Sequence, residues 1–477
     1  LPDYLPIANN ENVKFFEKYW NCEINPNPGL TVVEIMESIY NREIKGLYVM
    51  GENPAMSDPN ANHAREALAR LDMLIVQDIF LTETAYLADI VLPASAFPEK
   101  TGTFTNTDRR VQLARKAINP PGDAKQDLWI IQELAKRMGE MGLFGMCIPH
   151  EYGGQGLDYL SLIIAIEEIA RVDSSQAGTL SVHNSLGLGP IYYHGTDAQK
   201  EKFLPDLCTG KNIWAFALTE PDSGSDSRSS TTKAELKQKK WEINGTKTFI
   251  TNVNTPITRG VTVQVVTGVN KGKKEFSTLL VENGTKGMSA ETIHDKMMWR
   301  GTNTAQLFFD NCSIPEENIL GVRGEGSRTM LRSLDSGKLG ISAIGLGLAQ
   351  GAYEMALEYA KNRKQFGKSI SNYQAISFKL ADMHMKIELA RNMLYKACWL
   401  RDNNKHFSIE AAIIKLYSSE IAKEVADEAV QIHGGYGLIK EYPIERFYRD
   451  QRMLQVGEGT SEIQRLIISK YIGCYTK

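Results

Sequence analysis

A chain of 477 residues is too long for one ordinary hydrophobic core, so two to four domains are expected. Its 54 lysines and arginines nearly balance 57 aspartates and glutamates, and the formal net charge of -3 argues against nucleic acid or a membrane surface as a partner. The six cysteines show no metal-binding spacing and no apolar run could span a bilayer, so we predict a soluble, cytoplasmic, metal-free protein.

The first 139 residues alternate short apolar runs with helical patterns. Strands are predicted at residues 46–50, 73–76 and 89–92, and a helix is predicted near residues 62–71. Short buried strands separated by helices are typical of a parallel α/β unit. We therefore predict an α/β segment over residues 1–139.

Beyond residue 139 the pattern is helical, then strand-like, then helical again. A core-facing helix is predicted at residues 159–170, and residues 213 to about 320 have the pattern of a sheet, in which Asn244-Gly245 predicts a tight hairpin. Long helical patterns follow at residues 339–361, 373–402 and 409–432. This order predicts a multidomain α+β protein with domains at residues 140–211, 212–320 and 321–477.

Glycines at positions 345, 347 and 351 partly repeat the spacing of a dinucleotide-binding fingerprint. They lie inside a helical pattern with no preceding strand, so close helix packing is the better interpretation. A nicotinamide site is not predicted.

Two strand ends carry residues that could contact a cofactor. Residues 215–226 run from an apolar strand into a turn rich in Gly, Ser and Asp, which would expose backbone N–H groups and hydroxyls to a planar ring or a phosphate. Taken alone, the same pattern also describes an ordinary strand end. In residues 247–252, Phe249 and Thr251 could flank a cofactor or simply complete a hairpin.

Read together, these segments resemble the acyl-CoA dehydrogenase family over residues 140–473. The matching runs, in chain order, are 152–156, 218–226, 300–304, 363–368, 431–437 and 457–465. Six runs in the right order make chance agreement implausible. The resemblance implies the fold of that family: a helical domain, a small β-barrel-like domain and a C-terminal four-helix bundle, here preceded by the α/β segment.

The resemblance also implies one non-covalent FAD per subunit of a homotetramer. The isoalloxazine and ribityl side would be lined by Phe216, Leu218, Thr219, Gly224 and Ser225, with Phe249 and Thr251 across from them. The FAD of a neighbouring subunit would be reached by Arg363, Gln365, Phe366, Gln431 and Gly435. Thr460 and Glu462 would lie near the adenosine end. Arg363 carries the fork of donors that suits a pyrophosphate, although without the resemblance a solvated charge would be preferred.

The base is predicted to be Glu458, between Gly457 and Gly459. Residues 461–464 have the spacing of a capping box, so a helix is expected just after Ser461, with Glu458 in the turn before it. A lone Glu in such a turn is usually a solvated surface acid. The resemblance instead implies that its carboxylate takes the α-proton of an acyl-CoA thioester while the β-hydrogen leaves as hydride to the flavin, and that its backbone N–H helps to hold the thioester carbonyl. Burial should raise the carboxyl pKa towards neutrality.

Some branches of the family place the base on the helix expected to begin near Leu334. The matching position here is Gly337, which has no carboxylate, and nearby Asp335 is more simply a charge partner of the helix start. Glu458 is therefore the only base candidate with an assigned position.

Evidence on the substrate comes from the residues around the base. Substrate contacts are predicted for Ser225, Lys338, Gly457 and Gly459. Gly457 replaces a tyrosine of many straight-chain members, so either the cavity is wider or another residue fills the space. Residues 334–350 look most like short-chain members. We predict a short or compact acyl-CoA, which could be branched or cyclic, and electron-transferring flavoprotein as the electron acceptor.

Residues 1–139 resemble a different family, as an internal piece of the formate dehydrogenase catalytic subunit of the molybdopterin oxidoreductases. The matching runs are 48–54, 75–80, 88–93 and 102–112. Cys22 stands alone, without the iron-sulfur cysteines or the metal ligand, which excludes formate chemistry for this chain by itself. The two parts join within residues 134–143, where the helix pair that usually begins an acyl-CoA dehydrogenase is missing.

Three origins of this junction remain open: a natural gene fusion, an engineered joining, and two sequences wrongly assigned to one chain. Two functional alternatives also remain open. One is an enoyl-CoA reductase or oxidase on the same scaffold. The other is a non-catalytic flavoprotein, if the exchanged N-terminal segment disables the site.

Overall fold

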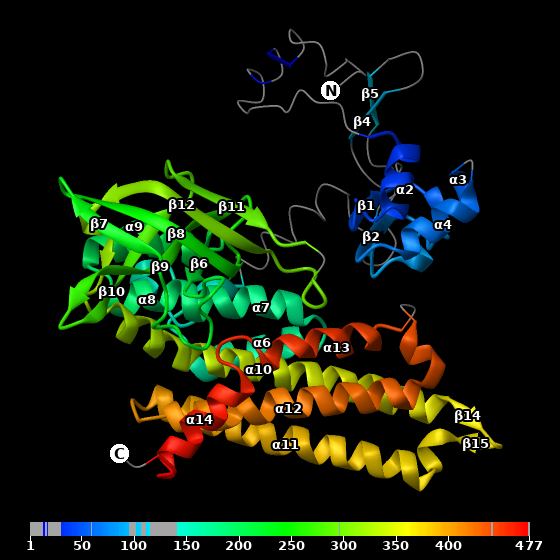
Figure 1. The fold of residues 1–477 in the computed structure, drawn as a ribbon. Helices are drawn as coiled ribbons and strands as arrows, with labels where there is room; N and C mark the ends of the chain where they lie inside the picture. The colour runs from blue at the N-terminus through cyan, green and yellow to red at the C-terminus, as the bar shows by residue number, and fades with distance from the viewer. Residues whose placement is uncertain are drawn as a thin grey trace. The chain divides into compact units, whose positions relative to one another are not determined.

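The computed structural model describes residues 30–94 apart from 59, residues 102–105 and 111–114, and residues 141–475 apart from 295, 440 and 441, together with residues 13, 14 and 17. The chain divides into two compact units, Leu1–Lys136 and Arg137–Lys477, and each is described by itself (Figure 1). Among the described residues, no helix combines the length and the apolar character needed to cross a membrane.

The first unit contains a small parallel α/β fold. Its sheet has the order β1-β2-β3, with both pairs parallel: β1 Gly46–Met50, β2 Met73–Asp78 and β3 Ile90–Pro93. The accompanying helices are α2 Val32–Tyr40, α3 Pro54–Ser57 and α4 Ala61–Ala69. Ile39 and Leu68 pack with Leu74 and Val76 in the core. The predicted parallel α/β arrangement is confirmed. A separate antiparallel pair joins β4 Gly102–Thr105 and β5 Val111–Ala114.

The second unit begins with a layer of helices. They are α6 Tyr159–Ala170, α7 Ser174–Val182, the π-helical turn η6 His183–Leu188, α8 Gly189–His194 and α9 Asp197–Cys208. Asp158 caps α6, whose apolar side packs on the long helix α10 (Gly326–Asn362). A Cβ on Gly347 would lie 2.1 Å from Glu167 O, so the glycines of α10 permit this close helix packing, as predicted.

The β domain follows in residues 213–320. Its strands are β6 Ile213–Ala217, β7 Lys233–Lys237, β8 Lys240–Thr251, β9 Thr258–Asn270, β10 Lys273–Glu282, β11 Met288–Thr292, β12 Thr304–Pro315 and β13 Ile319–Leu320. They form a sheet in the order β11-β12-β8-β7-β9-β10-β13, and β6 pairs in parallel with β9.

The hairpin predicted at Asn244-Gly245 is wrong. Both residues lie inside β8, and the chain reverses at Gln238-Lys239, where φ is 48° and 61°. Two successive left-handed residues make the two-residue turn that matches the twist of the flanking strands. Gly245 serves a close approach instead, because a Cβ there would lie 2.6 Å from Thr232 Oγ1.

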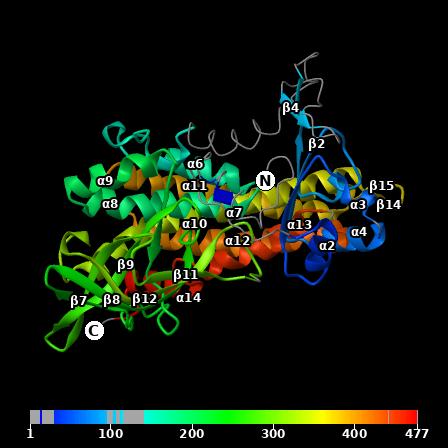
Figure 2. The ribbon, with the colours of Figure 1, turned by 90° about the horizontal axis from the view of Figure 1, so that it is seen from above.

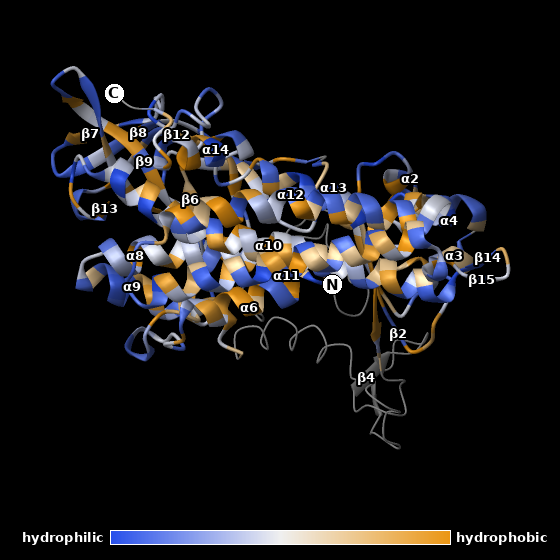
Figure 3. Ribbon diagram, turned by 90° about the horizontal axis from the view of Figure 1, so that it is seen from below, coloured by the Kyte–Doolittle hydropathy of each residue, from blue (hydrophilic) through white to orange (hydrophobic). Residues whose placement is uncertain are grey.

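The remaining chain forms the long helices. Besides α10 they are α11 Gln374–Asp402, α12 Ser408–His433, α13 Ile444–Asp450 and α14 Ser461–Tyr471, with the short pair β14 Lys364–Gln365 and β15 Lys368–Ser369 after α10. The middle of α10, from Gly337 to Ala349, is buried all round, and apolar stretches run along α6, α10 and α11 (Figure 3). Figures 1 and 2 show the β domain over one end of these helices, with β14 and β15 at the other end.

Candidate active site

Glu458 lies in the turn between a short 3-10 segment, Gln451–Gln455, and α14. The predicted position of the turn is correct, but the capping box is wrong by one residue. Thr460 is the cap, and its side chain accepts a hydrogen bond from Ile463 N at 3.3 Å. Ser461 donates instead to Glu420 at 3.0 Å. Thr460 and Ser461 both have a hydroxyl that could cap the helix. Ser461 is hydrogen-bonded to the Glu420 carboxylate of α12, so Thr460 is the residue that caps.

The backbone of the turn is strained at Glu458. Its φ is 52°, in the left-handed region that a non-glycine residue seldom adopts, and Gly459 follows at 94°. This conformation directs the carboxylate onto α10. A Cβ on Gly337 would lie only 2.2 Å from Glu458 Oε2. Gly337 therefore does more than lack a rival acid, because it leaves the space that the Glu458 carboxyl occupies.

The carboxyl group of Glu458 is enclosed by protein. Both oxygens are inaccessible to solvent and have no hydrogen-bond partner in the described part of the chain. Burial raises the pKa of Glu458 to about 7, against the opposing effect of the charges on Lys415 and Lys338. A carboxyl that titrates near neutrality, with free lone pairs, suits a general base.

Two neighbours of the base turn limit the space around it. A Cβ on Gly457 would lie 2.4 Å from Met453 Cε, so another residue fills the space beside this glycine. Lys338 is buried and donates to Asp335 at 2.7 Å. Asp335 lies well inside α10, which begins at Gly326, so the expected helix start near Leu334 is wrong. Asp335 is therefore a local partner of Lys338 rather than a helix-start charge.

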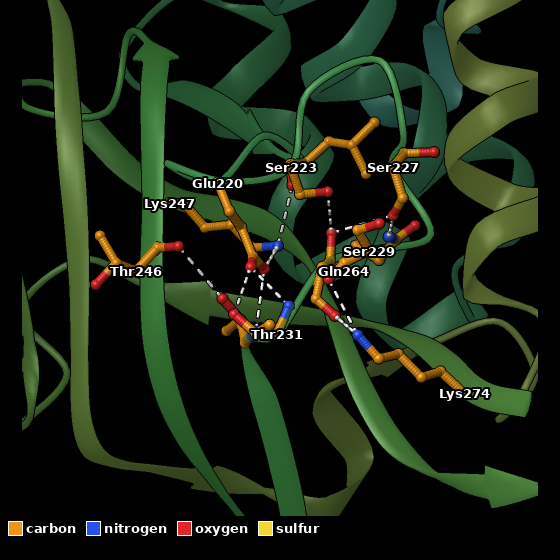
Figure 4. Close-up of polar contacts among 12 residues, drawn as sticks. Glu220, Ser223, Ser227, Ser229, Thr231, Thr246, Lys247, Gln264 and Lys274 are labelled. Carbon is orange, nitrogen blue, oxygen red and sulfur yellow. Dashed lines mark hydrogen bonds and ion pairs between the residues drawn. The ribbon is translucent and has the colours of Figure 1, made fainter.

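A buried ion pair between Glu220 and Lys247 stabilises the turn that follows β6. Glu220 accepts from Thr231 N at 2.6 Å, Thr232 N at 3.1 Å and Lys247 Nζ at 2.8 Å, and Lys247 also donates to Leu218 O at 3.0 Å (Figure 4). Burial alone would raise the pKa of Glu220, but Lys247 and these hydrogen bonds outweigh burial and hold it at about 2. The carboxylate stays charged and holds the turn.

The predicted flavin-facing residues surround this fastened strand end. Phe216 is buried, Leu218 and Thr219 are half-buried, and Gly224 and Ser225 are exposed. A Cβ on Gly224 would meet no atom within 4 Å, so this part of the turn is open.

Phe249 is presented by a β-bulge next to that strand end. Along β8 and β12, Ile250 pairs with Ala305 but Lys247 pairs with Leu307, so β8 carries one extra residue. Phe249 there has φ 59° and is 67% exposed, and Thr248 N connects the bulge to the segment after β6 by donating to Thr219 O at 2.9 Å. Bulges commonly re-aim a side chain beside a functional site. Phe249 thus lies near the strand end that carries Leu218 and Thr219, and the contacts of these residues and Thr251 with a flavin stay predictions.

A second group of predicted residues gathers at the far end of α10. A cavity of about 420 Å³ is lined by Tyr359, Arg363, Gln365, Ile370, Ile432, His433, Gly434, Gly435, Tyr436 and Ile439. Gln431 is exposed beside it, and Phe366, in the turn between β14 and β15, is 93% exposed. Arg363 follows Gly337 by 26 residues along α10, a separation of about 40 Å at 1.5 Å per residue. One chain therefore does not bring the two groups together.

Thr460 and Glu462 do not line the cavity at the far end of α10. Both lie at the start of α14, next to the base turn, and Glu462 is exposed. Among the described residues, no cluster of three or more His, Cys, Asp or Glu side chains could hold a metal ion.

Sequence reasoning missed Lys247, Lys415 and Met453. Lys415 carries a recognisable signal, because it falls on the apolar side of α12 among Ala411, Ile414 and Ser418, all buried. A lysine at a core-facing helical position is rarely buried without a partner. Met453 carries no comparable signal.

The geometry points first to a class of protein: a buried carboxyl group with a pKa of about 7, in a chain that combines a small sheet with long helices, is typical of an enzyme. Residues 324–473, 215–312 and 108–211 match the models of the C-terminal, middle and N-terminal domains of acyl-CoA dehydrogenase. Residues 7–137 match the molybdopterin oxidoreductase model, so residues 108–137 are matched by both.

Individual relatives agree with these matches. The probable acyl-CoA dehydrogenase YngJ of Bacillus subtilis (strain 168) is 46% identical over 362 residues, which are 76% of this chain and 95% of YngJ. The caffeyl-CoA reductase-Etf complex subunit CarC of Acetobacterium woodii is 42% identical over 71% of this chain and 89% of its own. The solved butyryl-CoA dehydrogenase of Megasphaera elsdenii superposes with a TM-score of 0.69 at 40% identity, covering 72% of this chain and 90% of that one.

The chain belongs to the acyl-CoA dehydrogenase family. It is an oxidoreductase, and its cofactor is FAD. The predicted fold and cofactor are confirmed, and so is the resemblance of the first residues to molybdopterin oxidoreductases. The domain boundaries and the roles of individual site residues stay predictions.

Proposed function

We propose that this protein dehydrogenates a short or compact acyl-CoA thioester to the trans-2-enoyl-CoA, with Glu458 as the base. One observation carries the proposal: the Glu458 carboxyl is buried, has no hydrogen-bond partner in the described chain and lies in the space left by Gly337. A structural acid buried in this way would be costly unless hydrogen-bonded. A base that must accept a proton from carbon needs its lone pairs free.

Different residues of this chain are proposed to accept the proton, to stabilise the thioester carbonyl and to contact the flavin. The carboxylate of Glu458 accepts the α-proton, and its own backbone N–H is the proposed donor to the thioester carbonyl, which stabilises the charge that develops there. FAD, when bound, supplies the two-electron acceptor for the β-hydrogen. Leu218, Thr219 and Phe249 would contact its ring, because an exposed aromatic side chain on a bulge and an open turn at Gly224 fit a planar group.

The separation of the two cofactor groups supports a homo-oligomer. Arg363 lies about 40 Å along α10 from Gly337, which is too far for Arg363 to hold the FAD that lies beside Glu458 of the same chain. Phe366, which is 93% exposed in the turn after β14, is also free to contact a further molecule. We therefore propose a homotetramer in which these residues reach the FAD of a neighbouring subunit.

Compact substrates are supported by the packing around the base. Val182, Leu186, Phe216 and Met330 form a small apolar cluster, and Leu186 Cδ2 lies 3.1 Å from a Cβ built on Gly337. Met453 fills the space beside Gly457. A neighbouring cavity of about 250 Å³ has Arg332 and Arg401 among its lining residues, and their charges do not favour a long hydrocarbon chain. The relative from Megasphaera elsdenii is described as a butyryl-CoA dehydrogenase.

Electron-transferring flavoprotein is the proposed acceptor. The relative CarC is described as a subunit of a complex with Etf, which supports this partner. We also propose a cytoplasmic location, because the scattered cysteines suit reduced thiols. Enoyl-CoA reduction is the second candidate, since CarC is named as a reductase.

Anaerobic titration of the holoenzyme with a panel of acyl-CoA thioesters tests the proposal. Short acyl-CoAs should bleach the flavin, with a rate that rises as pH rises through about 7, because the base must lose its proton to act. Glu458→Gln should retain FAD and lose about 100- to 10,000-fold in bleaching rate. Glu201→Gln, an exposed acid on α9 with no predicted part in the site, is the matched control.

Undiminished bleaching by Glu458→Gln would contradict the assigned base. Rapid reoxidation by air would indicate an oxidase, and turnover from enoyl-CoA with reduced Etf would indicate the reductase. A holoenzyme that no thioester bleaches would support a non-catalytic flavoprotein.

A further inference from the structure

A fully buried lysine lies against the base turn. Lys415 of α12 has no exposed surface, and its Nζ donates to Gly459 O at 2.6 Å. Among the described residues, no carboxylate forms an ion pair with it. Burying an ammonium group is costly unless it is paired, so stability alone does not account for this lysine.

The carbonyl that Lys415 contacts follows the strained residue of the site. Glu458 has a left-handed backbone, and such a conformation persists only where the surroundings over-determine it. Gln464 of α14 donates to the same carbonyl at 3.0 Å. Donors from two different helices thus converge on one peptide group, directly after the base.

We propose that Lys415 is a positioning residue. Its buried ammonium binds the Gly459 carbonyl, which fixes the strained backbone of Glu458 and so keeps the Glu458 carboxylate in the space beside Gly337. The inference rests on the proposed function, in which Glu458 is the base. Gln464 shares the hydrogen bonding, but Lys415 alone also brings a positive charge to this peptide group. Lys415 therefore acts on the base through geometry and through charge.

The charge gives the proposal a measurable signature. Burial lowers the pKa of Lys415 to about 8, so the ammonium remains largely charged at pH 7. Its charge opposes the effect of burial on Glu458, and removal of that charge should make Glu458 harder to deprotonate. The other ionisable groups that face the pair are Tyr159 of α6, Asp335 and Lys338 of α10, Glu420 of α12 and Glu462 of α14.

Two variants separate the hydrogen bond from the charge. Lys415→Met removes both, whereas Lys415→Gln removes the charge and keeps a donor. Lys423→Met, an exposed lysine on the same helix, is the matched control. Each holoenzyme is assayed for FAD content, for hydrogen exchange in the peptide over residues 453–465, and for anaerobic bleaching by butyryl-CoA from pH 5.5 to 9.

Lys415→Met should keep FAD, exchange faster over residues 453–465 and bleach about tenfold or more slowly at pH 7. Lys415→Gln should lose less of the rate, and in both variants the pH profile should move to higher pH. Lys423→Met should match the wild type. The proposal is overturned if both Lys415 variants bleach at the wild-type rate with an unshifted profile.

It is also overturned if both variants fail to assemble with FAD, because Lys415 would then serve folding. Failure of the proposed function is a separate result, seen as absent bleaching in the wild-type holoenzyme. The hydrogen-exchange comparison still applies in that case.

Discussion

The two ends of α10 are built in different ways. Near Gly337 the helix is buried on every side and meets a strained, enclosed carboxyl group. Near Arg363 the helix ends beside a cavity and a hairpin whose Phe366 is almost wholly exposed. The end near Gly337 is covered by other parts of the same chain. The end near Arg363 leaves an exposed surface that a further molecule can cover.

This difference teaches which residues one chain can organise alone. Within one chain, α10 leaves the space for the Glu458 carboxyl at Gly337, and α12 and α14 supply the donors to the Gly459 carbonyl that follows it. Arg363, the predicted pyrophosphate contact, lies about 40 Å along α10 from Gly337, which faces Glu458. Catalytic geometry is therefore expected to be a property of the subunit, and cofactor affinity a property of the assembly.

Gly337→Ala, which adds a methyl group at the buried end of α10, should have the largest effect on the bleaching rate. In Gly337→Ala the new carbon would lie 2.2 Å from Glu458 Oε2 and 3.1 Å from Leu186 Cδ2, so the base must move. A misplacement of about 1 Å at a catalytic group can cost roughly 100-fold in rate. The bleaching rate with butyryl-CoA should fall by about that factor, while the FAD content stays unchanged.

Gly189→Ala is the control for this substitution, since a Cβ there meets no atom within 4 Å and α8 accepts alanine readily. Equal bleaching by Gly337→Ala and the wild type would show that the carboxylate does not act from this position.

The end of α10 near Arg363 is tested by assemblies that combine two different variant subunits. The effect expected there, on FAD retention, is smaller. Arg363→Ala should weaken FAD retention about tenfold, because a charge-assisted fork to a pyrophosphate is lost. If Arg363 serves a neighbouring subunit, co-expression with Glu458→Gln should recover activity, since some sites then combine an intact base with an intact arginine. Lys361→Ala, exposed at the end of α10, is the control. No recovery in purified mixed assemblies would place Arg363 in its own subunit's site.

The sequence was sufficient for the features that depend on local pattern. Short apolar runs and their spacing predicted the parallel unit β1-β2-β3, and the glycine spacing in α10 predicted close helix packing. The base was predicted from an ordered set of motifs. Its role remains a prediction, but its enclosure agrees with the expectation of a raised pKa.

The features that pattern did not predict depend on tertiary neighbours. Thr460 and Ser461 both suit a cap, and only Glu420 on another helix decides which hydroxyl turns to the backbone. Asn244-Gly245 suits a turn, but the approach of Thr232 keeps it within a strand. The burial of Lys415 depends on the turn that packs over it. Such choices need contacts between segments far apart in sequence.

The smallest effect is expected from Met453→Ala. The Met453 side chain limits the space beside Gly457, so its removal should change the preference among acyl-CoA substrates. Met453→Ala would empty the space beside Gly457, and the bleaching rate of branched or longer acyl-CoAs relative to butyryl-CoA should rise by up to about tenfold. Met355→Ala, which packs on the same core from α10, controls for a general loss of packing. An equal change of preference in both variants would assign the effect to the core. A change confined to Met453→Ala would show that this side chain, in place of one at position 457, sets the size of the acyl group.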